Sequence, residues 1–387
     1  MKNTHLPTGW QEAKLRDILF ISSKKYDPQK NKTNYKCIEL EHIESDTGIL
    51  KGYINSNDQL SIKNIFENGD ILYGKLRPYL RKFHNAKFNG VCSSEIWVLK
   101  GKKVINEFLY YFIQSYKFDH IANISCGTKM PRADWSYMSE INFIIPPLEE
   151  QKRIAEVLSL CDEVIENLTE LIEKKEQYKK GVMQRLLSGE VRFKEFTDEW
   201  KNTTLNEVIK EKTVKNKNNK INLVLSVTNK DGFVIQNEFF GKTIASKDLS
   251  NYKIVDKWDF AYNPARVNVG SISMLENFDV CIVSPMYVVF SINHEIIYKY
   301  FLKYWIQSHN FNGYIKSLSA GSVRSILSFD AMSTMKIKVP SLEEQKKIAG
   351  LLSVIDEEIE NLKKQLELRK QQKKGLMQKL LTGEVRI

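Results

Sequence analysis

Two stretches of cationic, aromatic and amide side chains have the composition that binds nucleic acid. Arg and Lys bond bidentately to guanine and Asn bonds to adenine, while other cations hold phosphates and position the protein. The alternative is a strand-to-loop edge that carries solvated charges. The first stretch contains Lys75, Arg77, Tyr79, Arg81 and Lys82, and its counterpart contains Tyr262, Asn263, Arg266 and Asn268. We predict that these residues contact DNA.

A second pair of motifs places a glycine, a hydroxyl and a cation close together. These motifs supply a backbone N–H and side-chain donors at one point, which suits a phosphate. They recur at the same distance before two later repeats, which strengthens the prediction. The candidate DNA-binding residues are Thr128, Lys129 and Arg132 after Gly127, and Ser322 and Arg324 after Gly321.

No catalytic constellation is visible. The segment 69–75 spells most of a phosphate-binding loop, but Leu76 stands where Ser or Thr would hold magnesium, and Pro78 breaks the helix. Asn263-Pro264 lacks the second proline and the aromatic residue of an amino-methyltransferase motif. The six histidines form no pair four residues apart, as metal ligands on a helix would. We therefore predict a non-catalytic chain without a metal or cofactor of its own.

The elements that position these residues are revealed by an internal repeat. Residues 146–193 match residues 340–387 without a gap, with 29 of 48 positions identical. Each copy opens with Pro-x-Leu-Glu-Glu-Gln, continues with apolar residues spaced 4,3,4,3, and ends at Gly189 or Gly383. This spacing predicts a helix of about 40 residues with a heptad seam. The seam positions are Ile154, Leu158, Cys161, Ile165, Leu168, Ile172, Val182 and Leu186, then Ile348, Leu352, Ile355, Ile359, Leu362, Leu366, Leu376 and Leu380.

The seam is interrupted once in each copy, at Lys175/Lys179 and at the equivalent Arg369/Lys373. Three roles are open for these cations: setting the register, marking where the helices splay, or lining a surface for a partner.

The repeat predicts four segments and an α+β fold. Segments 1–145 and 194–339 are diverged mixed α/β domains, and segments 146–193 and 340–387 are helices that run antiparallel if their seams face each other. The resulting molecule has a pseudo-two-fold axis. Expected strands are Ile71–Tyr73, Ile96–Leu99, Ile221–Val227, Phe260–Tyr262 and Cys281–Phe290, and expected helices are Glu107–Tyr116 and Glu295–Ser308.

Charge follows the same division. The 387 residues carry a net charge of +11, which the four segments share as +6, −2, +5 and +2. The excess therefore lies in the two diverged domains, and it indicates a polyanionic partner, nucleic acid first and a membrane surface second. The five scattered cysteines and the absence of an apolar leader or spanning stretch predict a cytoplasmic protein with reduced thiols.

The layout resembles the specificity (S) subunit of type I restriction–modification enzymes. The resemblance rests on the paired IPPLEEQKRIA and VPSLEEQKKIA helix starts, the paired KKGVMQRLLSGEVRF and KKGLMQKLLTGEVRI helix ends, and GDILYGKLRPYL. It covers essentially the whole chain.

This resemblance implies two target recognition domains, each reading one half of a bipartite, asymmetric sequence in double-stranded DNA. It implies that the helices set the gap between the half-sites. Two modification (methyltransferase) subunits dock on this body, and restriction subunits join them. S-adenosylmethionine, ATP and Mg would then belong to those partners. It assigns no individual base contacts, because the recognition domains are the variable part of the family.

Two other classes of protein are weaker alternatives. A stand-alone methyltransferase or nuclease requires a cofactor loop or an acid triad, and neither is visible. A coiled-coil scaffold without a DNA role does not explain why the basic excess is confined to the two diverged domains.

Overall fold

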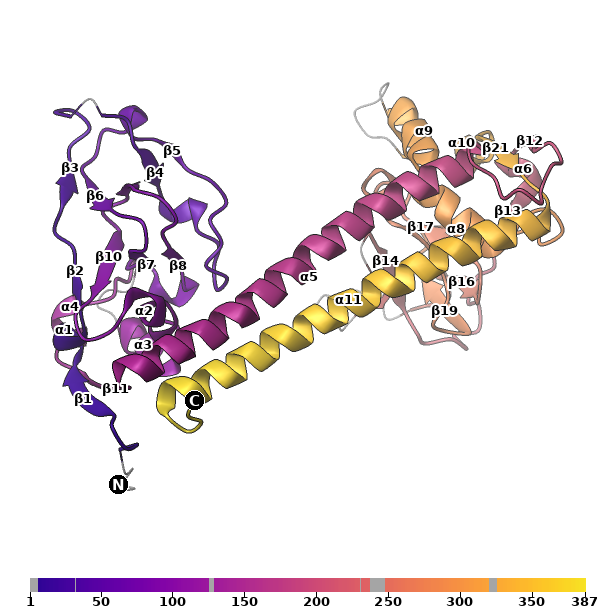
Figure 1. The fold of residues 1–387 in the computed structure, drawn as a ribbon. Helices are drawn as coiled ribbons and strands as arrows, with labels where there is room; N and C mark the ends of the chain where they lie inside the picture. The colour runs from indigo at the N-terminus through magenta and orange to yellow at the C-terminus, as the bar shows by residue number, and fades with distance from the viewer. Residues whose placement is uncertain (1–5, 32, 125–128, 230, 237–247, 320–325) are drawn as a thin grey trace. The chain divides into compact units, whose positions relative to one another are not determined.

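The computed structural model describes residues 6–31, 33–124, 129–229, 231–236, 248–319 and 326–387. The chain divides into two compact units (Figure 1). Unit 1 comprises Met1–Glu170 with Lys364–Ile387, and unit 2 comprises Leu171–Lys363. Each unit therefore combines one diverged domain with parts of both repeat segments. The four-segment division made from the sequence stays a proposal about the order of domains along the chain.

Unit 1 contains three antiparallel or mixed sheets. The first pairs β1 (Gln11–Lys14) with β11 (Asn142–Ile145). The second has the order β2 (Leu19–Ile21), β10 (Ile96–Gly101), β7 (Ile71–Gly74) and β8 (Phe83–Asn85). The third has the order β3 (Lys25–Tyr26), β6 (Lys63–Phe66), β9 (Gly90–Cys92), β4 (Lys36–Ile38) and β5 (Ile54–Asn55). The short helices are α1 (Leu15–Ile18), α2 (Asn106–Phe112), α3 (Tyr116–Asn123), α4 (Trp135–Met138), η1 (Leu40–His42), η2 (Ser56–Asp58) and η3 (Pro78–Leu80).

Unit 2 repeats the first two of these sheets. Here β12 (Lys201–Thr204) pairs with β21 (Lys336–Val339), and the four-stranded sheet has the order β13 (Ile209–Glu211), β20 (Val288–Ile292), β17 (Phe260–Tyr262) and β18 (Ile272–Met274). Two further antiparallel pairs are present, β14 (Leu225–Thr228) with β15 (Gly232–Ile235) and β16 (Lys253–Asp256) with β19 (Val280–Val283). The short helices are α6 (Leu205–Val208), α8 (Lys299–Gln307), α9 (His309–Ser319), α10 (Phe329–Ser333) and η4 (Val267–Val269). The shared framework confirms the mixed fold and the internal repeat.

The two repeat segments form long helices, as predicted. Helices α5 (Leu148–Ser188) and α11 (Leu342–Thr382) have 41 residues each. Every predicted seam residue is buried or half-buried. In unit 1 the start of α5 shares a core with the end of α11, and in unit 2 the start of α11 shares a core with the end of α5. The helices are therefore antiparallel (Figure 1).

Both helices end at the predicted glycines. Gly189 has φ +76° and Gly383 has φ +71°, a left-handed conformation that favours glycine. The amide of Val191 donates to the carbonyl of Arg185, and that of Val385 donates to Lys379, each six residues back. This closure turns the chain sharply, so that a short tail leaves each helix.

The tail of each helix bonds a buried glutamate at the start of the other. In unit 2, Arg192 binds Glu344 through two hydrogen bonds of 2.9 and 2.7 Å, and the indole of Trp200 donates to the same carboxylate. Glu344 is 1% exposed. The second glutamate of the Leu-Glu-Glu-Gln motif is thus a buried anchor whose charge is balanced by an arginine.

Unit 1 has the same anchor made from equivalent residues. Arg386 binds Glu150 at 3.1 and 2.8 Å, and the indole of Trp10 donates to it at 3.0 Å. The hydrogen bond from Arg386 lowers the pKa of Glu150 and keeps it ionised. In unit 1 the tail of α11 therefore bonds to the start of α5, and in unit 2 the tail of α5 bonds to the start of α11.

The glutamine of the same motif joins each long helix to its diverged domain. Gln345 is fully buried, donates to the carbonyls of Ile296 and Pro340, and accepts from the amide of Tyr298. Gln151 makes the equivalent three bonds in unit 1. The side-chain amides of Gln151 and Gln345 thereby hold each diverged domain against the first turn of its long helix.

The seam interruptions are polar bridges. Lys179 pairs with Asp356 at 2.5 Å, and the hydroxyl of Tyr304 donates to the other oxygen of that carboxylate at 2.9 Å. In unit 1, Lys373 and Asp162 form the same arrangement with a tyrosine of α2. Lys175 pairs with Glu358 across the helices. Of the three open roles, the register role fits these contacts, because each lysine reaches one acidic partner on the facing helix.

Several expected elements differ in their bounds. Cys281–Phe290 forms two strands, β19 and β20, because the amide of Tyr287 closes a turn onto Ser284. The strand expected at Ile221–Val227 begins only at Leu225. The helix expected over Glu107–Tyr116 ends at Phe112, and Ser115 caps a new helix, α3. The helix expected over Glu295–Ser308 begins at Lys299.

Candidate nucleic-acid interface

The two candidate motifs of unit 1 lie side by side. Strand β7 ends at Gly74, where a Cβ atom would lie 2.8 Å from the side chain of Leu40. Beyond it, the amide of Arg77 donates to the carbonyl of Pro131 at 2.7 Å, and the amide of Ala133 donates to the carbonyl of Lys75 at 2.9 Å. These bonds bring the segments 75–82 and 129–132 together into one surface.

Three candidates on this surface are open to a ligand. Arg77 has φ +52° and precedes Pro78, the first residue of η3, and its guanidinium makes no hydrogen bond or ion pair with any described residue. Tyr79 on η3 is 55% exposed. Lys129 is exposed as well. Their charge and aromatic face suit phosphates and bases.

Two further candidates are partly engaged. Arg132 forms a bidentate pair with Glu95, with both N–O distances 3.0 Å, and the hydrogen bond from Arg132 lowers the pKa of Glu95. The side chain of Arg132 is still 46% exposed. Lys75 is half-buried. Both remain candidates, with Arg132 held in place by its acidic partner.

Arg81 and Lys82 have structural partners instead. The guanidinium of Arg81 binds Asp46 at 2.5 Å and Asp119 at 2.7 Å, and Lys82 donates to the carbonyl of Leu40 at 2.6 Å. Because their polar atoms are already bonded within unit 1, we assign both residues to the scaffold of the turn. Sequence reasoning placed them on the DNA surface because it could not see these partners.

Unit 2 builds the equivalent turn after β17. The amide of Leu327 donates to the carbonyl of Pro264 at 3.1 Å, which matches the bond between Ala133 and Lys75. Asn263 is half-buried, and its side-chain oxygen accepts from the amide of Ala265, so it stabilises the turn. The exposed candidates are Arg266 and Asn268.

Tyr262 is a core residue. It is 0% exposed, and its hydroxyl donates to the carbonyl of Leu327 at 3.1 Å. Burial raises the pKa of this hydroxyl, which stays protonated. A buried, bonded side chain has no surface to offer DNA, so the prediction of a contact at Tyr262 is wrong. The candidates Thr128, Ser322 and Arg324 lie outside the described residues.

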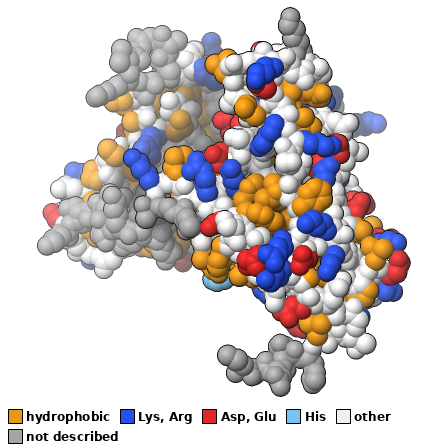
Figure 2. All heavy atoms as spheres, turned by 90° about the vertical axis from the view of Figure 1, so that its left-hand side faces the viewer, with side chains coloured by type: hydrophobic (Ala, Val, Ile, Leu, Met, Phe, Trp, Pro, Cys, Tyr) orange, Lys and Arg blue, Asp and Glu red, His pale blue; other side chains and the backbone are white. Residues whose placement is uncertain are grey.

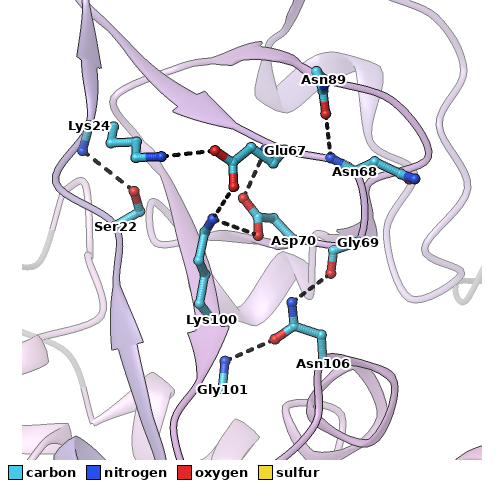
Figure 3. Close-up of polar contacts among 10 residues, drawn as sticks. All are labelled: Ser22, Lys24, Glu67, Asn68, Gly69, Asp70, Asn89, Lys100, Gly101 and Asn106. Carbon is cyan, nitrogen blue, oxygen red and sulfur yellow. Dashed lines mark hydrogen bonds and ion pairs between the residues drawn. The ribbon is translucent and has the colours of Figure 1, made fainter.

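A polar network fixes the other end of β7 (Figure 3). Asp70 accepts from the amide of Glu67 and pairs with Lys100 at 3.2 Å. Glu67 also bonds Lys100 and Lys24, which together lower its pKa to about 2. Asn106 donates to the carbonyl of Gly69 and accepts from β10. The candidate turn is therefore carried on a strand that is held at both ends.

The same support is built differently in unit 2. Asp259 accepts from the amide of Asp256 at 3.0 Å, as Asp70 does from Glu67. Here a single lysine, Lys212, pairs with both carboxylates. Burial raises the pKa of Asp259, and the lysine opposes this shift. The hydrogen bond from the backbone amide to the aspartate is therefore the same in both units. The lysines that pair with the carboxylates come from different sequence positions in the two units.

The described residues contain no group of three or more His, Cys, Asp or Glu side chains that could hold a metal ion. The phosphate-loop-like segment 69–75 runs through strand β7, so it has no helix N-terminus to receive a phosphate. Among the helices that the structure describes, none is long and apolar enough to cross a membrane.

Comparison with known proteins identifies the family. The family model for the type I restriction modification DNA specificity domain matches residues 7–177 and 197–370. The chain therefore belongs to this family and carries two copies of its domain. Its role is that of the DNA target-recognition subunit, which is not the catalytic member of the complex.

Curated relatives agree with this assignment. The MjaVIII type I restriction enzyme specificity subunit of Methanocaldococcus jannaschii is 27% identical over 426 residues, which cover 100% of this chain and 95% of the relative. The EcoDI specificity subunit of Escherichia coli is 28% identical over 48% of this chain and 43% of its own length.

Solved structures share the fold. The S subunit from M. genitalium has a TM-score of 0.57 at 18% identity and covers 98% of this chain and 97% of its own. The HsdS subunit from Thermoanaerobacter tengcongensis has a TM-score of 0.51 at 19% identity, with 99% of both chains covered.

Proposed function

We propose that each unit reads one half of a bipartite, asymmetric sequence in double-stranded DNA. The observation that carries this proposal is the equivalent turn after β7 and after β17, where Arg77 and Arg266 are both exposed on matching scaffolds. Their neighbours differ, with Tyr79 in one unit and Asn268 in the other. Non-identical readers on one framework read non-identical half-sites.

Surface composition supports a DNA partner. Figure 2 shows lysine and arginine side chains mixed with hydrophobic and acidic ones across the described part of one face. The net charge of the two diverged domains, +6 and +5, accounts for the whole excess of the chain. Such an excess attracts the phosphate backbone and makes binding depend on salt.

The paired helices are proposed to set the gap between the half-sites. Each helix of 41 residues has a length of about 60 Å. Salt bridges across the pair, such as Lys175 with Glu358 and Lys363 with Glu176, add to the apolar seam and hold the register. A fixed register gives a fixed gap.

The outer faces of the helices are proposed to dock two modification subunits. On α5, Leu160 and Val164 are 55% and 45% exposed, and on α11, Leu351 and Val354 are 39% and 62% exposed. Val354 occupies the position equivalent to Leu160. The sites are equivalent at this one position, since Glu358 stands where α5 has Val164, and an apolar residue repeated on a pseudo-two-fold body suits two copies of one partner.

The chemistry of the complex is assigned to these partners. The modification subunits would supply S-adenosylmethionine for methyl transfer, and restriction subunits that join them would use ATP and Mg. This chain contributes sequence recognition and spacing. We infer that the complex works in the cytoplasm, where its DNA substrate lies.

The methylated sequence motif tests this function directly. The chain is expressed with its modification subunit in a host free of DNA methylation, and the modified bases are located by sequencing. We expect one split motif with a fixed gap. If both proteins are present and folded and no modified base arises, the proposal is refuted. Docking is tested by co-purification with the modification subunit. The double variant Leu160→Asp/Val354→Asp should lose the partner, and the control Glu166→Gln should keep it.

A further inference from the structure

A cavity of about 540 Å³ opens in unit 2 beside the candidate turn. It lies between one face of α9, the C-terminal part of α5 and η4. The side chains that give it its chemistry are Lys180, Gln184, Asn268, His309, Asn312 and Lys316. Its volume is in the range of small-ligand sites rather than of packing defects.

The cavity has the lining of an anion site. Two lysines, a histidine and amide side chains surround it, and none of its described lining residues is acidic. Within the described residues, the side chains of Lys180, Lys316 and His309 form no hydrogen bond or ion pair. The inner wall is apolar and buried, made by Met183 and Ile315. Two exposed lysines beside an apolar wall give this cavity a positive potential that attracts an anion.

The equivalent position in unit 1 carries an ion pair. There Arg81 ends η3 in a left-handed conformation and reaches Asp119 on α3 at 2.7 Å. In unit 2, Gly270 ends η4 in the same conformation, and Asn312 replaces the aspartate. Unit 2 therefore lacks the bridge that Arg81 makes between turn and helix in unit 1.

The residues of α9 and α5 that line the cavity also differ from their counterparts in unit 1. In unit 1 the amide of Tyr116 donates to Gln378 at 3.1 Å, and Lys374 lies 5.9 Å from the ring of that tyrosine. Their counterparts in unit 2 are His309, Gln184 and Lys180, which face the cavity instead. At this position unit 1 is bridged by its own side chains, whereas unit 2 presents lysines that have no ionic partner among the described residues.

We propose that this cavity binds a phosphate group, and that the phosphate belongs to the backbone of the target DNA beside the bases read by the second unit. This inference rests on the proposed function. Asn268 lies two residues after Arg266 on the same turn, so the cavity continues the candidate reading surface. Lys180 belongs to α5, so a phosphate held there fixes the DNA to the spacer helix as well as to the recognition domain.

The test compares Lys180→Gln/Lys316→Gln with the matched control Lys374→Gln. The complex of the full chain with its modification subunits is titrated with a duplex that carries the methylated motif, at several salt concentrations. Loss of one phosphate contact should lower the salt slope of log K by about 1 and weaken binding roughly 5-fold at 0.15 M salt. The control should change neither. The motif itself should stay the same, since phosphates carry no sequence information.

Three outcomes overturn the proposal, and they are distinguishable. If the double variant keeps the wild-type slope and affinity while the motif is still methylated, the cavity holds no DNA phosphate although the function stands. Binding of dAMP and of inorganic phosphate to the wild-type complex and to the double variant is measured by calorimetry. If the variant loses this binding but keeps the wild-type affinity for the duplex, the cavity binds the phosphate of a free ligand. If the wild-type complex prefers no duplex, the proposed function itself fails. His309→Gln gives a second, milder variant, and far-UV circular dichroism checks folding.

Discussion

Replacing Gln345 by leucine should destabilise unit 2 severely, although the two side chains have almost the same volume. Gln345 is fully buried and makes three hydrogen bonds, to the carbonyls of Ile296 and Pro340 and from the amide of Tyr298. Leucine fills the space, so the cavity contribution is small. It leaves three backbone groups without a partner.

The magnitude follows from the burial of those groups. The bond to Pro340 is fully buried, and an unsatisfied carbonyl there costs about 2 kcal/mol. The other two bonds are partly buried, and each contributes about 1 kcal/mol. The free energy of unfolding should therefore fall by about 4 kcal/mol. With a urea dependence of about 2 kcal/mol per molar, the midpoint should drop by about 2 M.

Urea unfolding followed by circular dichroism measures this change. Gln151→Leu should lower the midpoint of unit 1 similarly, because Gln151 makes the same three bonds. The exposed Gln177 on α5 provides a matched control, since its replacement by leucine should cost less than about 0.5 kcal/mol. The amide of Tyr298 should also exchange its hydrogen faster in Gln345→Leu. A midpoint within about 0.5 M of wild type would refute the reasoning.

Three further predictions address reading, spacing and pH. Arg77→Ala and Arg266→Ala should each weaken binding to one half-site only, by about 1–3 kcal/mol if the residue reads a base. Binding to duplexes altered in either half measures this effect. A uniform loss of affinity for all DNA would mean that the residue contacts a phosphate. Deleting one heptad from each helix removes about 10 Å of length, so the methylated motif should keep its half-sites and change its gap by about 3 base pairs; an unchanged gap would contradict the spacer role. Because Lys100 and Lys24 lower the pKa of Glu67 from 4.5 to about 2, their contribution to stability is complete above pH 4.5 and is lost as the pH falls towards 2. Thermal unfolding of wild type and Glu67→Gln should therefore converge at about pH 2, and a constant difference would be evidence against the ion pair.

The long helices could be predicted from the sequence because their information is local and repeated. A 4,3,4,3 apolar spacing and two identical glycine stops define a helix without any knowledge of its partners. The antiparallel arrangement followed from the order of the segments. Secondary structure in the diverged domains was predicted less well, since it depends on pairing with distant segments: Cys281–Phe290 divides into β19, which pairs with β16, and β20, which pairs with β13 and β17.

The anchors at the helix starts were invisible to the sequence because they join distant residues. Arg386 and Glu150 are far apart along the chain, and so are Arg192 and Glu344, yet each pair forms two hydrogen bonds. A signal was present, since both arginines and both glutamates lie in the most similar parts of the repeat. Identity alone does not say which residues pair.

The candidate DNA surface was predicted by composition, and composition does not reveal burial. Arg77 and Arg266 are exposed as expected, but Tyr262 is core and Arg81 is paired with two aspartates. An aromatic or cationic residue after a strand points to solvent or to the interior according to the packing of its neighbours. The open cavity in unit 2 was missed because its lining residues come from α5, η4 and α9, which are far apart along the chain.

The anchors also bear on how such a chain can acquire a new specificity. Each recognition domain is attached to the helices through a tryptophan, a glutamate, a glutamine and an arginine that are the same in both units, while the reading turns differ. Under the proposed function, a domain that carries the same four residues would fit the same helices. Exchange of one domain would then change one half-site and leave the spacer unchanged.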